Sequence, residues 1–381
     1  MTVRVPVQEK LLTWAIERAG YAVEQFLAAQ PKAGPWLSGE KQPTLRQLEN
    51  LAKKLNVPFG YLLLPEPPEE APILPMFRTA GTGTPGVPPP VRDTILLIKQ
   101  RQEWLSEYLA DNGAEPLPFI ASATGDVSPL ELAERMRVVL GLGADQPIRK
   151  GKPADTLRTL TNRLEAIGVQ VAYSGVVGNN THRPIPVDDC RGFVLLDAYA
   201  PFIFINNADA KAAQLFTLVH EFAHLLLGHE GVIDLQHLLP ADDPLEKLCN
   251  AAAAEFLVPE QVLTVQWAKA PDIDKLARSF GVSQVVIGRR LLDLGIWNRS
   301  TFFTFYAEQQ AIWQAFRKKQ SSGGGGDFYA GKTLKVGRGF LSHVDTAVRS
   351  GALTYGEAYR LTGTNRSTYE KLTSGKTKNG G

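Results

Sequence analysis

The sequence contains very little cysteine, with Cys190 and Cys249 the only two in 381 residues. Two cysteines cannot build a disulfide framework, so a reducing compartment is expected. Long apolar runs are also missing, because no stretch approaches about 18 uninterrupted apolar residues. The first ten residues, MTVRVPVQEK, lack the apolar core of a signal peptide. We therefore expect a cytoplasmic protein with no membrane partner.

The chain also lacks a large excess of positive or negative charge. The chain has 41 Lys and Arg against 39 Asp and Glu, a formal net charge of +2. This balance excludes a uniformly basic nucleic-acid coat, although it leaves room for a small DNA-reading module. A hydrophobic content of 44% is that of a folded globular chain. At 381 residues the chain exceeds what one core holds, so two or three domains are expected.

Hydrophobic periodicity divides the chain and predicts an α+β fold that is mostly helical. The stretch PEPPEEAPILPMFRTAGTGTPGVPPP is too rich in Pro and Gly for a helix, and SSGGGG favours flexible coil. The predicted parts are a helical unit (1–64), a Pro/Gly-rich linker (65–90), a helical lead-in followed by the main domain (91–316), a Gly-rich linker (317–327) and a short helical tail (328–381). Strand-like runs at 169–176 and 192–207 predict a small sheet, the second run as a hairpin.

The main domain carries the pattern His220-Glu221-Phe222-Ala223-His224. On a helix, residues i and i+4 share one face, so both imidazoles can reach a single tetrahedral Zn²⁺. Glu221 lies beside the first histidine and can contact a water on the metal. The neighbouring residues are strongly apolar, so the two histidines and the glutamate would be costly to bury without a metal. This context favours a zinc site over a chance pattern on a solvated helix.

A catalytic zinc site needs a third protein ligand and an open position for water. The downstream candidates are His229, Asp234, His237, Asp242, Asp243 and Glu246. Glu246 is favoured because it opens the apolar segment EKLCNAAAAEFLVP, whose alanines permit close packing against the first helix. Asn250, four residues on, then places an amide on the same face to hydrogen-bond a ligating histidine. The alternative for Glu246 is a first-turn glutamate that complements the helix dipole.

These two segments, FTLVHEFAHLLLGH and EKLCNAAAAEFLVP, are similar to the ImmA/IrrE-type metallopeptidases, in which HExxH is followed by E-x-x-x-N on the next helix. The stretch ERAGYAVEQFLAAQ…WLSGEKQPTLRQLENLAKKLNVPFGYLLL resembles the Xre-type helix-turn-helix often fused to that domain. The resemblance implies a helix-turn-helix bundle followed by a zincin-like domain with a small sheet. It also implies zinc held by His220, His224 and Glu246, with Glu221 as the general base.

Metal chemistry then suggests a mechanism. Zinc would lower the pKa of its water toward about 7, Glu221 would take the proton, and hydroxide would attack a scissile carbonyl. The strand FIFIN could offer a free edge to an extended substrate peptide. The residue that would stabilise the oxyanion in addition to the metal is not determined by the sequence. The candidates, without ranking, are Tyr173, His182, Arg191 and Tyr199.

A DNA-reading role would fall on the segment PKAGPWLSGEKQ, with Lys32, Ser38, Lys41 and Gln42 as its polar contacts to double-stranded DNA. Gly34 and Pro35 are poor residues for a helix interior. Residues 1–64 carry eight Lys and Arg against five Asp and Glu, a modest excess for phosphate binding. The alternative is a degenerate helix-turn-helix that serves packing or protein contacts.

Three functions therefore remain open. The resemblance implies a regulatory zinc endopeptidase that cleaves a protein partner, such as a transcriptional repressor or an antitoxin, with activity that can be latent. The alternative is a DNA-binding transcriptional regulator, or a toxin-neutralising antitoxin, that uses the metal domain mainly as a scaffold. A purely structural zinc would need a fourth protein ligand, and Cys249 is the candidate, although helical geometry turns it away from the face of Glu246.

Overall fold

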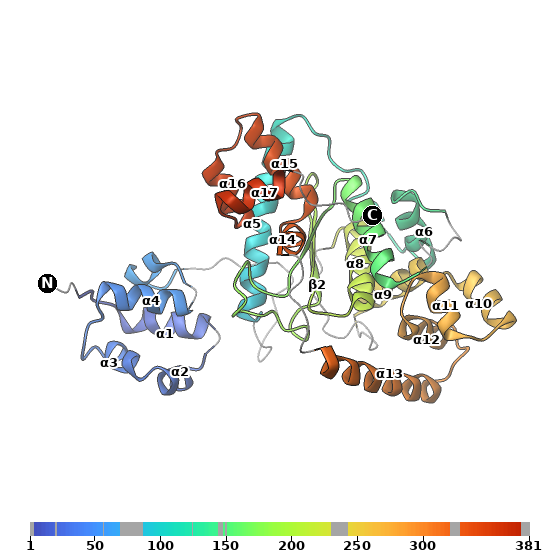
Figure 1. Ribbon diagram of the computed structural model, residues 1–381, viewed down its shortest axis with the longest axis horizontal. Helices are drawn as coiled ribbons and strands as arrows, with labels where there is room; N and C mark the ends of the chain where they lie inside the picture. Colours follow the sequence, from blue (N-terminus) through green and yellow to red (C-terminus); the bar gives the residue numbers. More distant parts are fainter. Residues whose placement is uncertain are drawn as a thin grey trace. The chain divides into compact units, whose positions relative to one another are not determined.

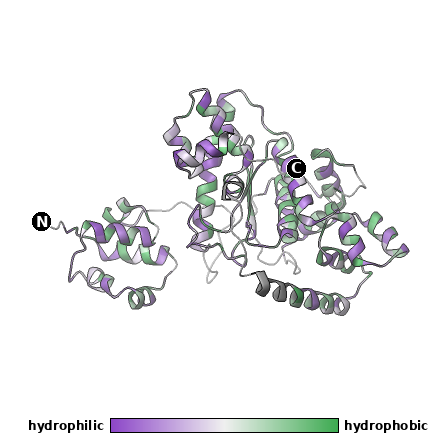
Figure 2. Ribbon diagram, in the orientation of Figure 1, coloured by the Kyte–Doolittle hydropathy of each residue, from purple (hydrophilic) through white to green (hydrophobic). Residues whose placement is uncertain are grey.

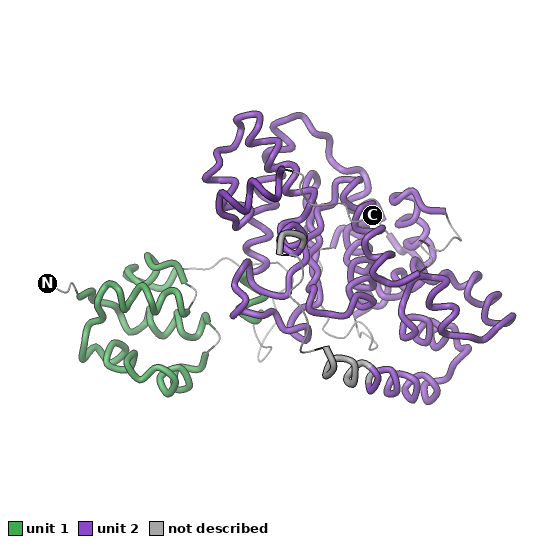
Figure 3. Tube along the Cα trace, viewed as in Figure 1, with its two compact units in different colours: residues 1–93 green, residues 94–381 purple. Residues whose placement is uncertain are grey.

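The computed structural model describes residues 4–19, 21–55, 57–68, 87–123, 125–143, 148, 151–229, 243–320 and 328–374, without the side chains of 310, 313–320 and 328–330. Within them the chain is mostly helical with one small sheet, which agrees with the expected α+β class. The chain divides into two compact units, residues 1–93 and residues 94–381, coloured separately in Figure 3. The linkers expected at 65–90 and 317–327 lie largely outside the described residues.

The first unit is a small bundle of short helices (Figure 1). Its elements are α1 (Glu9–Arg18), α2 (Val23–Ala29), η1 (Pro31–Ala33), α3 (Gly34–Leu37), α4 (Leu45–Leu55) and η2 (Phe59–Leu63). Thr44 caps α4, because its hydroxyl accepts the amide of Gln47 while the Gln47 side chain accepts the amide of Thr44. Leu12, Ile16 and Phe26 join the leucines of α4 in a common core.

The segment expected as a recognition helix is not one regular helix. It consists of the three-residue 3₁₀ turn η1 followed by the four-residue helix α3. Pro31 and the Gly34-Pro35 pair explain the break, since proline removes a backbone donor and glycine weakens a helix interior. The helix-turn-helix assignment of residues 1–64 therefore stays a prediction.

The second unit is built on a three-stranded sheet of β1 (Gln170–Tyr173), β2 (Gly192–Leu195) and β3 (Phe202–Ile205). The strand order is β1-β3-β2; β3 runs parallel to β1 and antiparallel to β2. The hairpin expected from residues 192–207 is therefore present. Every residue of the three strands is buried, so both faces of the sheet are covered.

The sheet order corrects one expectation. The FIFIN segment contains β3, and β3 is the central strand, hydrogen-bonded on both sides. It therefore has no free edge for a substrate peptide. The prediction was wrong because the parallel pairing of β1 with β3 joins strands about 30 residues apart in the sequence. A four-residue apolar run also has the same sequence pattern in a central strand as in an edge strand.

Helices surround the sheet, and hydrophobic and hydrophilic residues alternate along most of them, as Figure 2 shows. The core helices are α5 (Pro89–Asp111), α6 (Pro129–Val139), α7 (Pro153–Ala166), α8 (Lys211–Leu227) and α9 (Pro244–Leu257). They are followed by α10 (Glu260–Lys269), α11 (Ile273–Phe280), α12 (Gln284–Asp293) and α13 (Arg299–Gln320). Within the part of the chain that the structure describes, none of the helices has both the length and the apolar character needed to cross a bilayer.

The tail packs on the same unit as four helices, α14 (Phe328–Val336), α15 (Arg338–Arg349), α16 (Tyr355–Thr362) and α17 (Arg366–Thr373). Helices α14 and α15 contact β1, and the tail lies beside α5 in Figure 1. Arg101 of α5 is buried and donates to the carbonyl oxygens of Lys335 and Leu361. These carbonyls lie in the last turns of α14 and α16, where a cation is favourable for the helix dipole. Phe340 packs edge-on against Phe202 of β3.

Helix α8 lies directly on the sheet because Gly192 leaves space for it. A Cβ at this position would approach Cγ2 of Thr217 to 2.5 Å and the carbonyl oxygen of Phe204 to 2.8 Å. Both distances are shorter than real contacts allow. The absence of a side chain at the first residue of β2 therefore sets how closely α8 approaches the strand.

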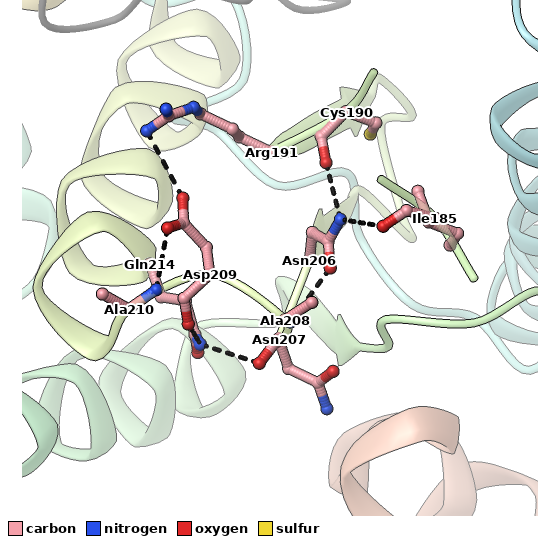
Figure 4. A network of polar contacts seen from close by, with 9 residues as sticks. All are labelled: Ile185, Cys190, Arg191, Asn206, Asn207, Ala208, Asp209, Ala210 and Gln214. Atoms are coloured by element: carbon pink, nitrogen blue, oxygen red, sulfur yellow. Dashed lines mark hydrogen bonds and ion pairs between the residues drawn. The ribbon is translucent and has the colours of Figure 1, made fainter. Parts of the chain in front are cut away.

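The turn from β3 into α8 is fixed by a buried polar network (Figure 4). Asn206 is fully buried; its Nδ2 donates to the carbonyl oxygens of Ile185 at 2.9 Å and Cys190 at 2.8 Å, and its Oδ1 accepts the amide of Ala208. Gln214 of α8 donates to the carbonyl oxygens of Asn207 and Asp209. Strand β3, the loop before β2 and the start of α8 are thus held together by side-chain amides.

We expect Gly192→Ala to destabilise the second unit by about 1–3 kcal/mol, because the added methyl group forces α8 away from β2. Chemical denaturation followed by circular dichroism measures the change. Gly331→Ala is the matched control: this position in α14 has nothing within 4 Å of the added Cβ, so we expect no loss of stability and a gain of up to about 1 kcal/mol. Equal losses in the two variants would contradict this packing.

We expect Asn206→Asp to cost about 2–4 kcal/mol, because it removes both amide donors and places a carboxylate against two carbonyl oxygens in a buried site. The neighbouring Asn207→Asp is the control, since the Asn207 side chain is partly exposed and points away from the network in Figure 4. The urea concentrations at the midpoints of unfolding of the two variants measure the difference in stability. A midpoint for Asn206→Asp as high as that of Asn207→Asp would refute the role of the network.

Candidate metal centre

Helix α8 brings the HExxH residues into the interior. All positions from Gln214 to Leu226 are buried, and the helix ends at Gly228, whose φ of 72° is left-handed. His220, Glu221 and His224 are each 1% exposed. The apolar residues around them predict this burial, because a helix that is apolar on all sides has no solvent face. The three polar side chains are therefore removed from water almost completely.

Helix α9 supplies the third side chain. Asp243 caps its start, accepting the amide of Leu245 at 2.7 Å, and Pro244 occupies the first helical position. Glu246 follows in the first turn. The small buried residues Ala252 and Ala253 allow α9 to contact α8 closely, as the sequence suggests.

Three potential ligand residues meet between the two helices, Glu246 with both of its carboxylate oxygens. His220 Nε2 and His224 Nε2 are 3.0 Å apart. Glu246 places Oε2 3.1 Å from His220 Nε2 and Oε1 3.3 Å from His224 Nε2. In a tetrahedral zinc site with bonds of about 2.0 Å, neighbouring ligand atoms are about 3.3 Å apart. The donor set of two imidazoles and one carboxylate, together with this spacing, therefore fits a zinc ion.

The charges in this cluster are strongly perturbed. Burial lowers the pKa of His220, although its hydrogen bond with Glu246 acts in the opposite sense. Burial would raise the pKa of Glu246, but the hydrogen bonds from His220 and His224 outweigh it and hold that pKa well below its usual range. Glu246 is therefore an ionised carboxylate facing two imidazoles.

Glu221 occupies a different environment. Burial raises the pKa of its carboxyl group well above the ordinary value, and the negative charge of Glu246 raises it further. Its Oε2 is buried without a hydrogen-bond partner among the described residues. A buried carboxyl oxygen without a partner is costly, so this atom calls for a bound water or cation beside it.

Asn250 lies four residues after Glu246 on α9, and its side chain acts to raise the pKa of His220. Its Oδ1 is buried without a hydrogen-bond partner among the described residues. Two other downstream candidates are placed elsewhere. His229 is exposed after the end of α8, and Asp243 is the cap of α9. Asp234, His237 and Asp242 lie outside the described residues.

The four candidates for oxyanion stabilisation do not join the cluster. The Tyr173 hydroxyl is hydrogen-bonded to Thr161 at 2.6 Å, and Arg191 pairs with Asp209 at 3.4 Å. His182 is exposed, and Tyr199 is partly buried in the turn between β2 and β3. None of the four is therefore assigned to the reaction.

Both cysteines lie near the cluster. The sequence did not predict this position for Cys190. Burial raises the pKa of both thiols; the charge of Glu221 adds to the shift at Cys190, and those of Glu246 and Glu221 add to it at Cys249. The thiols are thus protonated, small buried groups. The group of possible ligands within the described residues consists of His220, His224 and Glu246, without Cys249. No sequence signal places Cys190 there, because only the folding of the loop before β2 brings it to α8.

The residues expected to contact DNA belong to the first unit. Lys32, Ser38, Lys41 and Gln42 are all exposed, in or just after the short helices η1 and α3. Trp36 packs partly against the core of that unit, as expected for a structural residue. The DNA-binding role of the four exposed residues stays a prediction.

Comparison with known proteins gives two matches to protein families. Residues 336–374, which form α15 to α17, match a family described as a domain of unknown function (DUF8813). Residues 165–292 match the IrrE N-terminal-like domain, and this segment contains the sheet, α8 and α9.

A curated relative, the radiation response metalloprotease IrrE of Deinococcus radiodurans, is 41% identical over 66 residues. The match covers 16% of this chain and 20% of the relative, so the chain spans about a fifth of the length of that protein. The family match and this relative together support a peptidase domain of the ImmA/IrrE type within the second unit.

Proposed function

We propose that the protein is a zinc-dependent metallopeptidase in which His220, His224 and Glu246 hold the metal and Glu221 is the general base. One observation carries the proposal: His220 Nε2 and His224 Nε2 lie 3.0 Å apart, and each lies within 3.3 Å of a carboxylate oxygen of Glu246. The adjacent Glu221 adds a buried carboxyl oxygen that has no hydrogen-bond partner among the described residues. Four protein ligands would indicate a structural site, whereas three leave a position for water.

Each residue of the cluster has a separate proposed role in peptide hydrolysis. A zinc ion held by His220, His224 and Glu246 would supply a Lewis acid and would lower the pKa of an attacking water. Glu221 accepts the proton of that water and returns it to the leaving amine. Asn250, whose side chain acts on the pKa of His220, is proposed to orient that imidazole, and Glu246 contributes negative charge that would balance the cation.

The substrate peptide is proposed to pair with the outer edge of β2. An extended peptide needs a strand edge, and the sheet has two, on β1 and β2. The tail helices α14 and α15 contact β1, whereas β2 contacts α8, the helix of the two histidines. A peptide along β2 would thus lie closer to the metal ligands than one along β1.

The physiological role is proposed to be regulatory. The resemblance to ImmA/IrrE-type enzymes favours cleavage of one protein partner, such as a transcriptional repressor or an antitoxin, in preference to general digestion. The first unit and the tail add helical surfaces that a peptidase does not need for bond cleavage. Such surfaces suit a protein whose activity depends on a partner or a signal.

Metal analysis tests the ligands. We expect about one zinc per purified chain, lost in His224→Ala and retained in Glu221→Gln and Cys249→Ala, because only the first change removes a ligand. Inductively coupled plasma mass spectrometry gives the stoichiometry, and circular dichroism confirms that each variant is folded. Loss of zinc in Cys249→Ala would instead indicate a closed structural site with a thiolate ligand.

Cleavage tests the base. We expect Glu221→Gln to reduce proteolysis by about 10²-fold or more while zinc and fold are retained. Mass-spectrometric profiling of new protein N-termini, in cells of the source organism expressing either form, measures it. Glu134→Gln, an exposed position on α6, is the control and should cleave like the wild type. Cleavage by Glu221→Gln at the wild-type rate would refute the assigned mechanism.

A further inference from the structure

The second unit contains a cavity of about 190 Å³ that is separate from the metal cluster. Its walls come from α7, from β1, from the start of α8 and from the tail. Lys211, the first residue of α8, lines it, and His220 follows nine positions later on the same helix. At 1.5 Å per residue this is about 13 Å along the helix axis.

Part of the lining of the cavity is apolar. Leu157 of α7 and Val171 of β1 are buried residues that line it. Leu334 of α14 also lines it, yet this leucine remains 36% exposed. An exposed leucine that lines the same cavity as two buried apolar residues indicates a space suited to an apolar group.

The charged residues of the lining are mostly positive. Arg158, Lys211 and Arg338 line the cavity with one acidic residue, Glu165. Glu165 accepts the amide of Gly339 at 3.3 Å and feels the charge of Arg338, so its carboxylate is already engaged. Arg158 is paired with Asp155 at 3.2 Å on the surface.

Lys211 differs from the two arginines. Its ammonium donates to Oε1 of Gln214, a neutral amide, and it has no carboxylate partner among the residues that the structure describes. The cavity thus joins an apolar wall to a lysine whose charge is not balanced locally. An anion beside Lys211 would receive a charge-assisted hydrogen bond.

We propose that this cavity binds a small monocarboxylate with a compact apolar body, and that the bound molecule fastens the tail to the core of the unit. The apolar body lies against Leu157, Val171 and Leu334, and the carboxylate lies at Lys211. A cavity of about 150 Å³ accepts a benzene-sized molecule, so the space suits a ligand of roughly ten heavy atoms.

Larger anions fit this cavity poorly. A nucleotide exceeds the volume, and inorganic phosphate leaves the apolar wall uncovered. The link to the tail follows from the lining, because Leu334 belongs to α14 and Arg338 to α15, whereas Lys211 and Leu157 belong to the core. A ligand that contacts both parts binds the docked state more tightly and therefore favours it.

Ligand-observed NMR on the full chain tests binding with benzoate and hexanoate as probes, and with benzamide and benzylamine as the neutral and cationic counterparts. We expect dissociation constants on the order of 0.1–1 mM for the carboxylates, and binding about tenfold weaker for the counterparts. Absence of carboxylate binding at about 10 mM, or equal binding of benzylamine, would overturn the proposal. The readout involves no peptide hydrolysis, so the result is independent of the proposed peptidase.

Two pairs of variants locate the site. Ala154→Trp places a large ring at the cavity from an exposed position on α7 and should abolish benzoate binding, whereas Ala166→Trp, exposed at the end of the same helix, should not. Lys211→Gln should weaken benzoate about tenfold and leave benzamide unchanged, with the exposed Lys269→Gln of α10 as its control. Equal effects within either pair would place the ligand elsewhere.

Hydrogen exchange measures the link to the tail. Benzoate should slow exchange of the backbone amides of α14 in the wild type and not in Ala154→Trp. Unchanged exchange at saturating benzoate would show that the ligand does not fasten the tail.

Discussion

The burial of two histidines and two carboxylates between α8 and α9 is the constraint on which the rest of the structure depends. Each of His220, Glu221 and His224 is 1% exposed, and Glu246 approaches both imidazoles within 3.3 Å. Charges removed from water in this way are expensive unless they are paired and hydrogen-bonded. The cluster is therefore sustainable only in a precise arrangement, and a cation bound to its three ligand atoms would offset most of its cost.

The remaining elements of the second unit secure that arrangement. Gly192 allows α8 to lie directly on β2, and Asn206 fixes the turn through which the chain enters α8. Asp243 and Pro244 start α9 at the point where Glu246 falls in its first turn. These residues are not among the possible metal ligands, yet each sets the position of a helix that carries ligand atoms. A shift of about 1 Å between α8 and α9 would separate atoms that now lie about 3 Å apart.

The sequence predicted the parts of the site that depend on local periodicity. The i, i+4 spacing of His220 and His224, and the same spacing of Glu246 and Asn250, follow from the geometry of one helix. The structure brings the three proposed ligands together, and the side chain of Asn250 acts on the pKa of His220. Long-range pairing could not be predicted in the same way. The central position of β3 results from its parallel pairing with β1, and Cys190 lies near Glu221 only because the sheet packs against α8.

The docking of the tail illustrates the same limit. Arg101 bonds carbonyl oxygens 234 and 260 residues further along the chain, a relation that no local pattern contains. Its burial has a physical consequence. Helices of 8 to 12 residues, the lengths of α14 to α17, are marginal alone in water. A buried guanidinium would in turn be costly without the carbonyls at the ends of α14 and α16. The tail and α5 therefore stabilise each other, and the cavity beside Lys211 lies along the boundary between tail and core.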